Sequence, residues 1–261
     1  MIAVANPVRA ALAAGQVSLG VGVRGLRSGE IAPIMKSAGF DWLFIDLEHG
    51  PSSVETAFTL SVAALSAGIV PMVRVPAGEM VLAARCLDGG ALGVFVSHVD
   101  TVADAEEAVQ ALRFPPLGHR SAGGNYPQLG FQGGSAKDVI PAIEQATMIM
   151  ATLETAKAVE NAAAIAAVPG IDVLTMGMND LSVDMGIPGQ LGHERMATAV
   201  QTVVQAANAA GKFVGFGGVY QPDLIKKYVG LGMRMILSGN DVGLLFAAAK
   251  ERAAFVRGCM T

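Results

Sequence analysis

Acidic and imidazole side chains stand directly after several short apolar runs of this 261-residue chain. Asp46, Glu48 and His49 lie at the end of one run, Glu154 closes another, and Asp180 comes shortly after a third. Two carboxylates with room for water and substrate oxygens suit a hard divalent cation such as Mg²⁺ or Mn²⁺. The alternative for Glu154 and Asp180 is structural, with Glu154 in an ion pair and Asp180 as the N-cap of a helix.

His49 is a candidate general base, because the unperturbed pKa of histidine lies near neutrality. Asp88 ends a helical stretch and could orient the imidazole, or it could be an ordinary helix-terminal charge. Arg74 lies in an otherwise apolar run, and a buried guanidinium requires an anionic partner. That partner could be a substrate carboxylate, or simply Asp46 or Glu48.

Other catalytic chemistries lack their residues. No lysine interrupts an apolar run, whereas a Schiff-base lysine needs a desolvated pocket that lowers its pKa. A serine nucleophile elbow and the glycine-rich loops that bind nucleotides are also missing from the sequence. The residues therefore favour a metal over an imine for activating a carbonyl group.

Eight apolar runs alternate with Ala-rich stretches of helical spacing, and this alternation predicts the elements that hold these residues. The predicted strands are Leu19–Val23, Trp42–Leu47, Val70–Val75, Ala91–Val96, Met148–Leu153, Ile171–Met176, Phe213–Gly217 and Met235–Leu237. The predicted helices include Ser53–Ser66, Val81–Leu87, Val102–Leu112, Ala156–Ala167, Ala197–Ala210 and Val242–Arg257. Eight such repeats predict a closed (β/α)8 TIM barrel, whose chemistry lies at the carboxyl ends of the strands. An open doubly wound sheet would have the same alternation.

No linker or shift in composition divides the chain, so we expect one barrel domain over residues 1–261. The segment Phe114–Gly134, with three prolines and six glycines, is too long for an ordinary connection and is predicted to be a functional loop. The chain is 52% hydrophobic with a net charge of −4, which provides no basic field for nucleic acid or an anionic membrane.

Every apolar run is too short for a spanning helix, which needs roughly 18 residues, and no secretory signal is visible at the start. Cys86 and Cys259 are far apart in the sequence. We therefore expect neither a disulfide framework nor a thiolate metal site. We expect a cytoplasmic setting.

Five segments together resemble the HpcH/HpaI aldolase family of class II, pyruvate-dependent aldolases. They are Phe40–Pro51, Val73–Pro76, Arg113–Arg120, Leu153–Thr155 and Asp180–Gly186. The likeness extends in order over nearly the whole chain. It implies a metal-dependent enzyme that reversibly cleaves 4-hydroxy-2-oxoacids, such as 4-hydroxy-2-oxoheptanedioate, into pyruvate and an aldehyde.

The resemblance also implies roles for single residues. Glu154 and Asp180 would hold a divalent cation (Mg²⁺, Mn²⁺ or Co²⁺), which stabilises the enolate formed when the C3–C4 bond breaks. Arg74 would contact the pyruvate oxygens, and His49 would exchange the 4-hydroxyl proton with support from Asp88. The backbone around Gly177 and Met178 would bind the pyruvate carboxylate. Family members are usually hexamers, with part of each site supplied by a neighbouring subunit.

The chain departs from the family pattern at two places. Thr152 stands where family members carry Gln, and Gly177-Met178-Asn179-Asp180 replaces Gly-Pro-Ala-Asp. Thr152 is therefore expected to alter the substrate contacts rather than the metal ligands. Arg120, in the long loop, is expected either to bind a distal substrate carboxylate or to anchor its own loop.

Two other functions compete with the aldolase reading. One is a related carbon–carbon lyase or decarboxylase that acts on another oxoacid or a CoA ester. The other is a non-catalytic metabolite-binding barrel, which the presence of a candidate general base disfavours.

Overall fold

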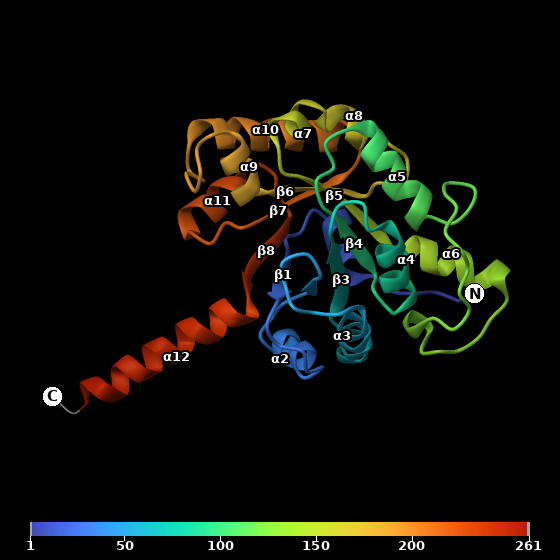
Figure 1. Ribbon diagram of the computed structural model, residues 1–261, viewed down its shortest axis with the longest axis horizontal. Helices are drawn as coiled ribbons and strands as arrows, with labels where there is room; N and C mark the ends of the chain where they lie inside the picture. The colour runs from blue at the N-terminus through green and yellow to red at the C-terminus, as the bar shows by residue number, and fades with distance from the viewer. Residues whose placement is uncertain (1, 260–261) are drawn as a thin grey trace.

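Eight parallel strands follow one another around a closed barrel in the computed structural model, which describes residues 2–259 (Figure 1). The first strand pairs with both the second and the eighth, and this pairing closes the sheet. The strands are β1 Ser18–Val23, β2 Trp42–Asp46, β3 Val70–Val75, β4 Gly93–Val96, β5 Met148–Leu153, β6 Val173–Gly177, β7 Phe213–Gly217 and β8 Met235–Asn240. The predicted (β/α)8 barrel is confirmed, and the open doubly wound sheet is excluded.

Helices follow the strands and surround the barrel. They are α1 Pro7–Ala13, α2 Ile31–Ser37, α3 Val54–Ala67, α4 Met80–Asp88, α5 Val102–Leu112, α6 Ala136–Ala146, α7 Ala156–Glu160, α8 Ala162–Ala166, α9 Met178–Asp184, α10 Glu194–Ala209, α11 Pro222–Gly230 and α12 Asp241–Gly258. The predicted single helix Ala156–Ala167 is wrong, because it is broken at Asn161. The amide of Asn161 donates to the carbonyl of Asp100 at 2.8 Å, which ties this point to the preceding loop.

The strands are mostly apolar because both of their faces are buried, and the polar residues of β2, β3 and β5 lie near the carboxyl ends. One face packs against the surrounding helices, and the other fills the barrel with large side chains such as Trp42 and Met148. Gly20 on β1 has to be glycine, since a Cβ there would lie 2.2 Å from the Trp42 ring. Helix α1 adds Val8 and Leu12 to this interior cluster and covers the amino ends of the strands. The carboxyl ends are left accessible to ligands.

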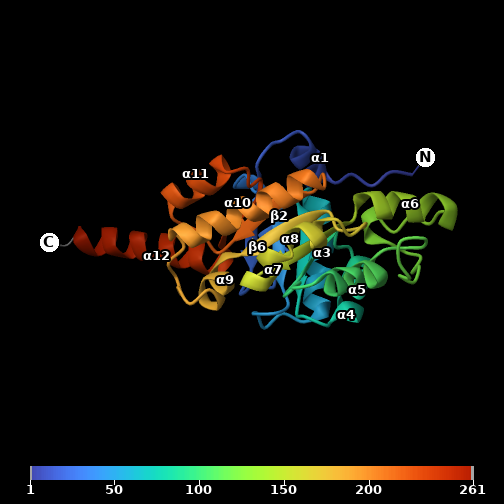
Figure 2. The ribbon, with the colours of Figure 1, turned by 90° about the horizontal axis from the view of Figure 1, so that it is seen from above.

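Two segments depart from the regular pattern. The stretch Phe114–Gly134 is irregular, as predicted, apart from the 3-10 turn η1 Pro127–Leu129. Helix α12 extends away from the barrel (Figures 1 and 2), and every residue from Val242 to Cys259 is exposed. Within residues 2–259 we find no helix with the length and apolar character needed to cross a membrane.

Candidate active site

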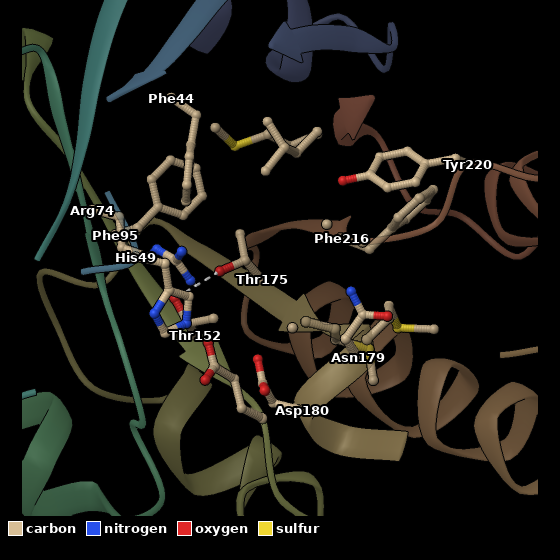
Figure 3. A pocket seen from close by; sticks show the side chains of 18 of the residues that line it. Phe44, His49, Arg74, Phe95, Thr152, Thr175, Asn179, Asp180, Phe216 and Tyr220 are labelled. Atoms are coloured by element: carbon tan, nitrogen blue, oxygen red, sulfur yellow. Dashed lines mark hydrogen bonds between the residues drawn. The ribbon is translucent and has the colours of Figure 1, made fainter. Parts of the chain in front are cut away.

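A cavity of about 230 Å³ lies at the carboxyl ends of the strands, where a barrel of this type places its chemistry. All eight strands or the loops after them contribute to its wall. Its apolar surface includes Phe44, Phe95 and Phe216 (Figure 3). The predicted residues His49 and Arg74 lie on one side of this cavity in Figure 3, and Tyr220 lies on the other. The cavity therefore combines an apolar surface with charged groups.

Arg74 is held by two carboxylates of this chain. Its Nε and Nη2 donate to the two oxygens of Asp46 at 3.0 and 2.5 Å, and its Nη1 lies 3.0 Å from Oε2 of Glu48. Burial is the largest single effect and acts against the charge of Arg74, but the hydrogen bond and charge of Asp46 together with the charge of Glu48 outweigh it, and the pKa of Arg74 is raised. Both structural partners that were considered for Arg74, the carboxylates of Asp46 and Glu48, are therefore present. The result is a rigid positive group at the cavity wall.

Asp46 is the centre of this network. Its side chain is fully buried, and its Oδ1 also accepts the backbone N–H groups of Glu48 and His49, each at 3.1 Å. Burial alone would raise the pKa of Asp46, yet the hydrogen bond and charge of Arg74 lower it below its usual value. A third donor, Nε of Arg24, reaches Oδ2 of Asp46 at 2.9 Å. Asp46 thus stays ionised and orients two guanidinium groups.

Glu154 is buried at the end of β5, with 2% of its side chain exposed. Burial raises the pKa of Glu154 to about 7, and the carboxylates of Asp180 and Glu48 act in the same direction. His98 opposes this shift, since its Nδ1 lies 3.4 Å from Oε2 of Glu154. Gly177 makes room for this carboxyl, because a Cβ at Gly177 would lie 2.7 Å from Cγ of Glu154.

Asp180 lies in the first turn of α9 and faces the cavity (Figure 3). The N-cap of this helix is Gly177, so the N-cap alternative for Asp180 is wrong. The groups Glu154 and Asp180 repel each other electrostatically in the ionised form, and a divalent cation between them would relieve that repulsion. Among residues 2–259 no cluster of three or more His, Cys, Asp or Glu is placed to hold a metal. A two-carboxylate site fits Mg²⁺-like ions, which keep several waters and bind substrate oxygens.

His49 is 56% exposed at the cavity, and its Nε2 lies 3.9 Å from Oε2 of Glu48. Its backbone N–H is bound to Asp46, so the start of the loop after β2 is fixed while the ring faces the cavity. Thr152, Gly177 and Met178, the other candidate substrate contacts, also line the cavity. The hydroxyl groups of Thr152 and Thr175 lie 3.3 Å apart.

Asp88 and Arg120 do not reach this cavity within one chain. Neither residue lines the cavity, and Asp88 is the last residue of α4. Nη2 of Arg120 donates to Oδ1 of Asp88 at 2.7 Å, and its guanidinium lies 4.6 Å from the centre of the Phe114 ring. Only 1% of the Arg120 side chain is exposed. The structure therefore shows Arg120 anchoring its loop.

Several cavity residues were missed by the sequence analysis. Arg24, Asn179 and Tyr220 line the cavity, and each lies just after a strand or at the start of the next helix. Their position at the carboxyl end of a strand was the available signal.

The comparisons with known proteins agree with this geometry. A family model described as HpcH/HpaI aldolase/citrate lyase matches residues 25–248. The chain belongs to this family, and it is accordingly an enzyme of the lyase class. It is 37% identical over 255 residues to 4-hydroxy-4-methyl-2-oxoglutarate aldolase cghB of Chaetomium globosum, covering 96% of this chain and 95% of that protein.

Two further relatives extend the comparison. The hydroxypyruvate/pyruvate aldolase of Cupriavidus necator is 33% identical over 252 residues, covering 97% of this chain and 93% of that protein. The crystal structure of an HpcH/HpaI aldolase from Desulfitobacterium hafniense superposes with a TM-score of 0.89 at 29% identity, covering 95% of this chain and 96% of that one. The resemblance drawn from the five sequence segments is thereby confirmed.

Proposed function

We propose that the protein is a divalent-metal-dependent aldolase that reversibly cleaves 4-hydroxy-2-oxoacids, such as 4-hydroxy-2-oxoheptanedioate, to pyruvate and an aldehyde. The observation that carries the proposal is the meeting of the buried Glu154 with Asp180 in the cavity that also holds Arg74 and His49. The relatives named as aldolases of oxoacids support the same class of substrate.

Glu154 and Asp180 would hold the cation, which is Mg²⁺, Mn²⁺ or Co²⁺. When bound, this ion supplies Lewis-acid stabilisation to the negative charge that develops on the oxoacid. Arg74, fixed by Asp46 and Glu48, places a permanent positive charge beside the same oxygens. Backbone N–H groups around Gly177 and Met178 would orient the carboxylate, and Thr152 would contact the substrate with its short hydroxyl.

His49 would act as the general base. In the cleavage direction its imidazole accepts the proton of the 4-hydroxyl, and the electron pair of the C3–C4 bond moves to C3 as the new carbonyl forms. C3 then takes up a proton, which yields pyruvate. The half-exposed ring at the cavity suits a group that has to exchange protons with substrate.

Asp88 would support His49 only from a neighbouring copy of the chain. Its side chain is 41% exposed and is oriented by the buried Arg120. Helix α12 supports assembly as well, because its large apolar side chains are exposed together, which is typical of an interaction surface. The proposal therefore includes a homo-oligomer, a hexamer by family resemblance. The free thiols of Cys86 and Cys259 support a cytoplasmic setting.

The test is the release of pyruvate from a 4-hydroxy-2-oxoacid with Mg²⁺ or Mn²⁺, with a chelator, and with Glu154→Gln. We expect release that the chelator and the variant both abolish. Glu160→Gln is the matched control, since Glu160 is an exposed glutamate of the same βα unit outside the cavity. Activity that survives both the chelator and Glu154→Gln would contradict the proposal.

A second candidate function is a carbon–carbon lyase or decarboxylase acting on another oxoacid or a CoA ester. The exposed Asn179 and Tyr220 at the cavity favour it, because they add polar groups beyond the metal and pyruvate ligands. Binding of metal and pyruvate without release of pyruvate from any 4-hydroxy-2-oxoacid would point to this function. His49→Ala then separates it from a mere binding protein, since only a catalyst loses turnover while ligand binding persists.

A further inference from the structure

A second guanidinium, that of Arg24, lies at the cavity beside Arg74. It differs from Arg74 in the number of its nitrogens that have no partner within the chain. All three nitrogens of Arg74 already face carboxylates, whereas Arg24 uses only Nε, in its bond to Asp46. Among the described residues, Nη1 and Nη2 of Arg24 have no hydrogen-bond partner. The side chain is 40% exposed, so these two nitrogens are accessible to a ligand.

The position of Arg24 is fixed from two directions. Its own backbone N–H donates to Oδ1 of Asp241 at 3.0 Å, and the N–H groups of Gly25 and Leu26 donate to Oδ2 at 2.9 and 2.7 Å. Asp241 is buried, with 2% exposed. The side chain is anchored at Nε by Asp46, which is also buried. A fork of two N–H groups held in this way is preorganised for a carboxylate.

The order of the strands places this fork across the cavity from the metal ligands. In a closed ring of eight strands, β5 with Glu154 lies opposite β1, which Arg24 follows. Arg74 on β3 and His49 after β2 lie between them along the ring. A 4-hydroxy-2-oxoacid bound by its oxoacid end at Glu154 and Asp180 would therefore pass Arg74 and His49 and direct its far end toward Arg24.

We infer that Arg24 is the residue that binds a second carboxylate of the substrate, on the far side of C4 from the oxoacid end, and so sets a preference for diacids. This inference rests on the proposed aldolase function and specifies its substrate class. In cleavage the carbonyl product then retains the carboxylate that Arg24 holds. Arg24 is a specificity residue here, and it takes no part in the transfer of protons or in the breaking of the bond.

Binding of two uncleavable ligands tests the inference without turnover. The pair is 2-oxoglutarate and 2-oxopentanoate, which share a five-carbon chain and the oxoacid end but differ in a terminal carboxylate against a methyl group. Both are titrated into the Mg²⁺-loaded full-length protein. We expect the wild type to favour 2-oxoglutarate by about 10- to 100-fold, and Arg24→Gln to abolish most of that preference. Arg24→Lys keeps the charge without the fork, so it should retain part of the preference.

Arg27→Gln is the matched control, because Arg27 belongs to the same loop, carries the same charge and lies outside the cavity. It should keep the full preference. The inference is overturned if the wild type does not distinguish the two ligands, or if Arg24→Gln weakens both equally, which would mean that Arg24 only supports Asp46.

The kinetic counterpart compares kcat/KM for 4-hydroxy-2-oxoglutarate and 4-hydroxy-2-oxopentanoate, and the ratio should fall in Arg24→Gln. If neither compound releases pyruvate while the binding preference persists, the aldolase proposal fails and the assignment of Arg24 stands. If both are cleaved equally well by the wild type, the assignment fails and the aldolase proposal stands.

Discussion

In the cavity, burial and neighbouring charges act in opposite directions on the pKa of single carboxyl groups. Asp46 is buried yet ionised, because Arg74 and Arg24 donate to it. Glu154 is buried without a guanidinium of its own, and its carboxyl is therefore raised in pKa to about 7. A pair of buried groups with opposite shifts is typical of catalytic sites, although ion-pair networks also produce them. A bound cation would stabilise the ionised form of Glu154, whereas the guanidinium groups of Arg74 and Arg24 already stabilise that of Asp46.

The raised pKa of Glu154 predicts how metal-free protein responds to pH. Between the unfolded pKa of 4.5 and the folded value of about 7, the native state keeps a proton that the unfolded state has lost. Stability from this group is thus present at low pH and falls as the pH rises through 7. Glu154→Gln removes the penalty, so its free energy of unfolding should exceed that of the wild type by roughly 2.5 kcal/mol more at pH 8 than at pH 5.

Urea unfolding in the presence of a chelator measures this difference. Glu160→Gln serves as the control, because an exposed carboxyl should show no comparable growth of the difference with pH. A gap between Glu154→Gln and wild type that stays constant from pH 5 to pH 8 would mean that Glu154 titrates normally in the folded protein.

At the scale of elements, the start of α12 and the loop after β1 form one unit. The carboxylate of Asp241 accepts the N–H groups of Arg24, Gly25 and Leu26, and a Cβ at Gly25 would lie 2.6 Å from Val242. The next residue back, Asn240, caps α12 through its bond from the Gly243 N–H. One short segment thus begins a helix and positions a cavity loop.

Asp241→Asn tests this coupling. An amide group replaces one carboxylate oxygen with a donor, so at least one of the buried loop N–H groups loses its acceptor. We expect amide hydrogen exchange at residues 24–26 to accelerate at least about tenfold, which corresponds to a loss of about 1.4 kcal/mol in local opening. Amides of the central strand β5 are the internal reference, and equal acceleration there would indicate global rather than local destabilisation.

At the scale of the whole molecule, the barrel is closed but its last helix does not cover it. Helix α12 carries apolar side chains that are mostly exposed, among them Leu245 at 61% and Phe246 at 67%. Large apolar side chains that are exposed together normally mark an interaction surface. The projecting helix therefore favours an assembly in which another copy covers it.

Replacing Leu245 and Phe246 together by Glu should dissociate that assembly, because two charges would be placed in an apolar interface. Light scattering coupled to size-exclusion chromatography measures the mass of wild type and variant. Lys250→Gln, an exposed polar position of the same helix, should leave the mass unchanged. A wild type that is already monomeric would remove the basis for the oligomer and for support of His49 by a neighbouring Asp88.

The order and type of the strands could be predicted from the sequence, because the burial of both strand faces leaves a local record of continuous apolar runs. All eight runs became strands, and the candidates Glu154, Asp180, Arg74 and His49 all line one cavity. Their placement follows from a rule that needs only chain order, since parallel strands bring their carboxyl ends to the same edge.

Tertiary structure alone decided which of these groups touch. Closure of the sheet, the pairing of Asp46 with Arg24 and Arg74, and the contact of His98 with Glu154 join segments far apart in the sequence. The same alternation of strands and helices would serve an open sheet, so no local pattern encodes these pairs. Asp88 shows the limit most clearly: its residue type suits the role of orienting a histidine, but its place at the end of α4 gives it Arg120 as its partner.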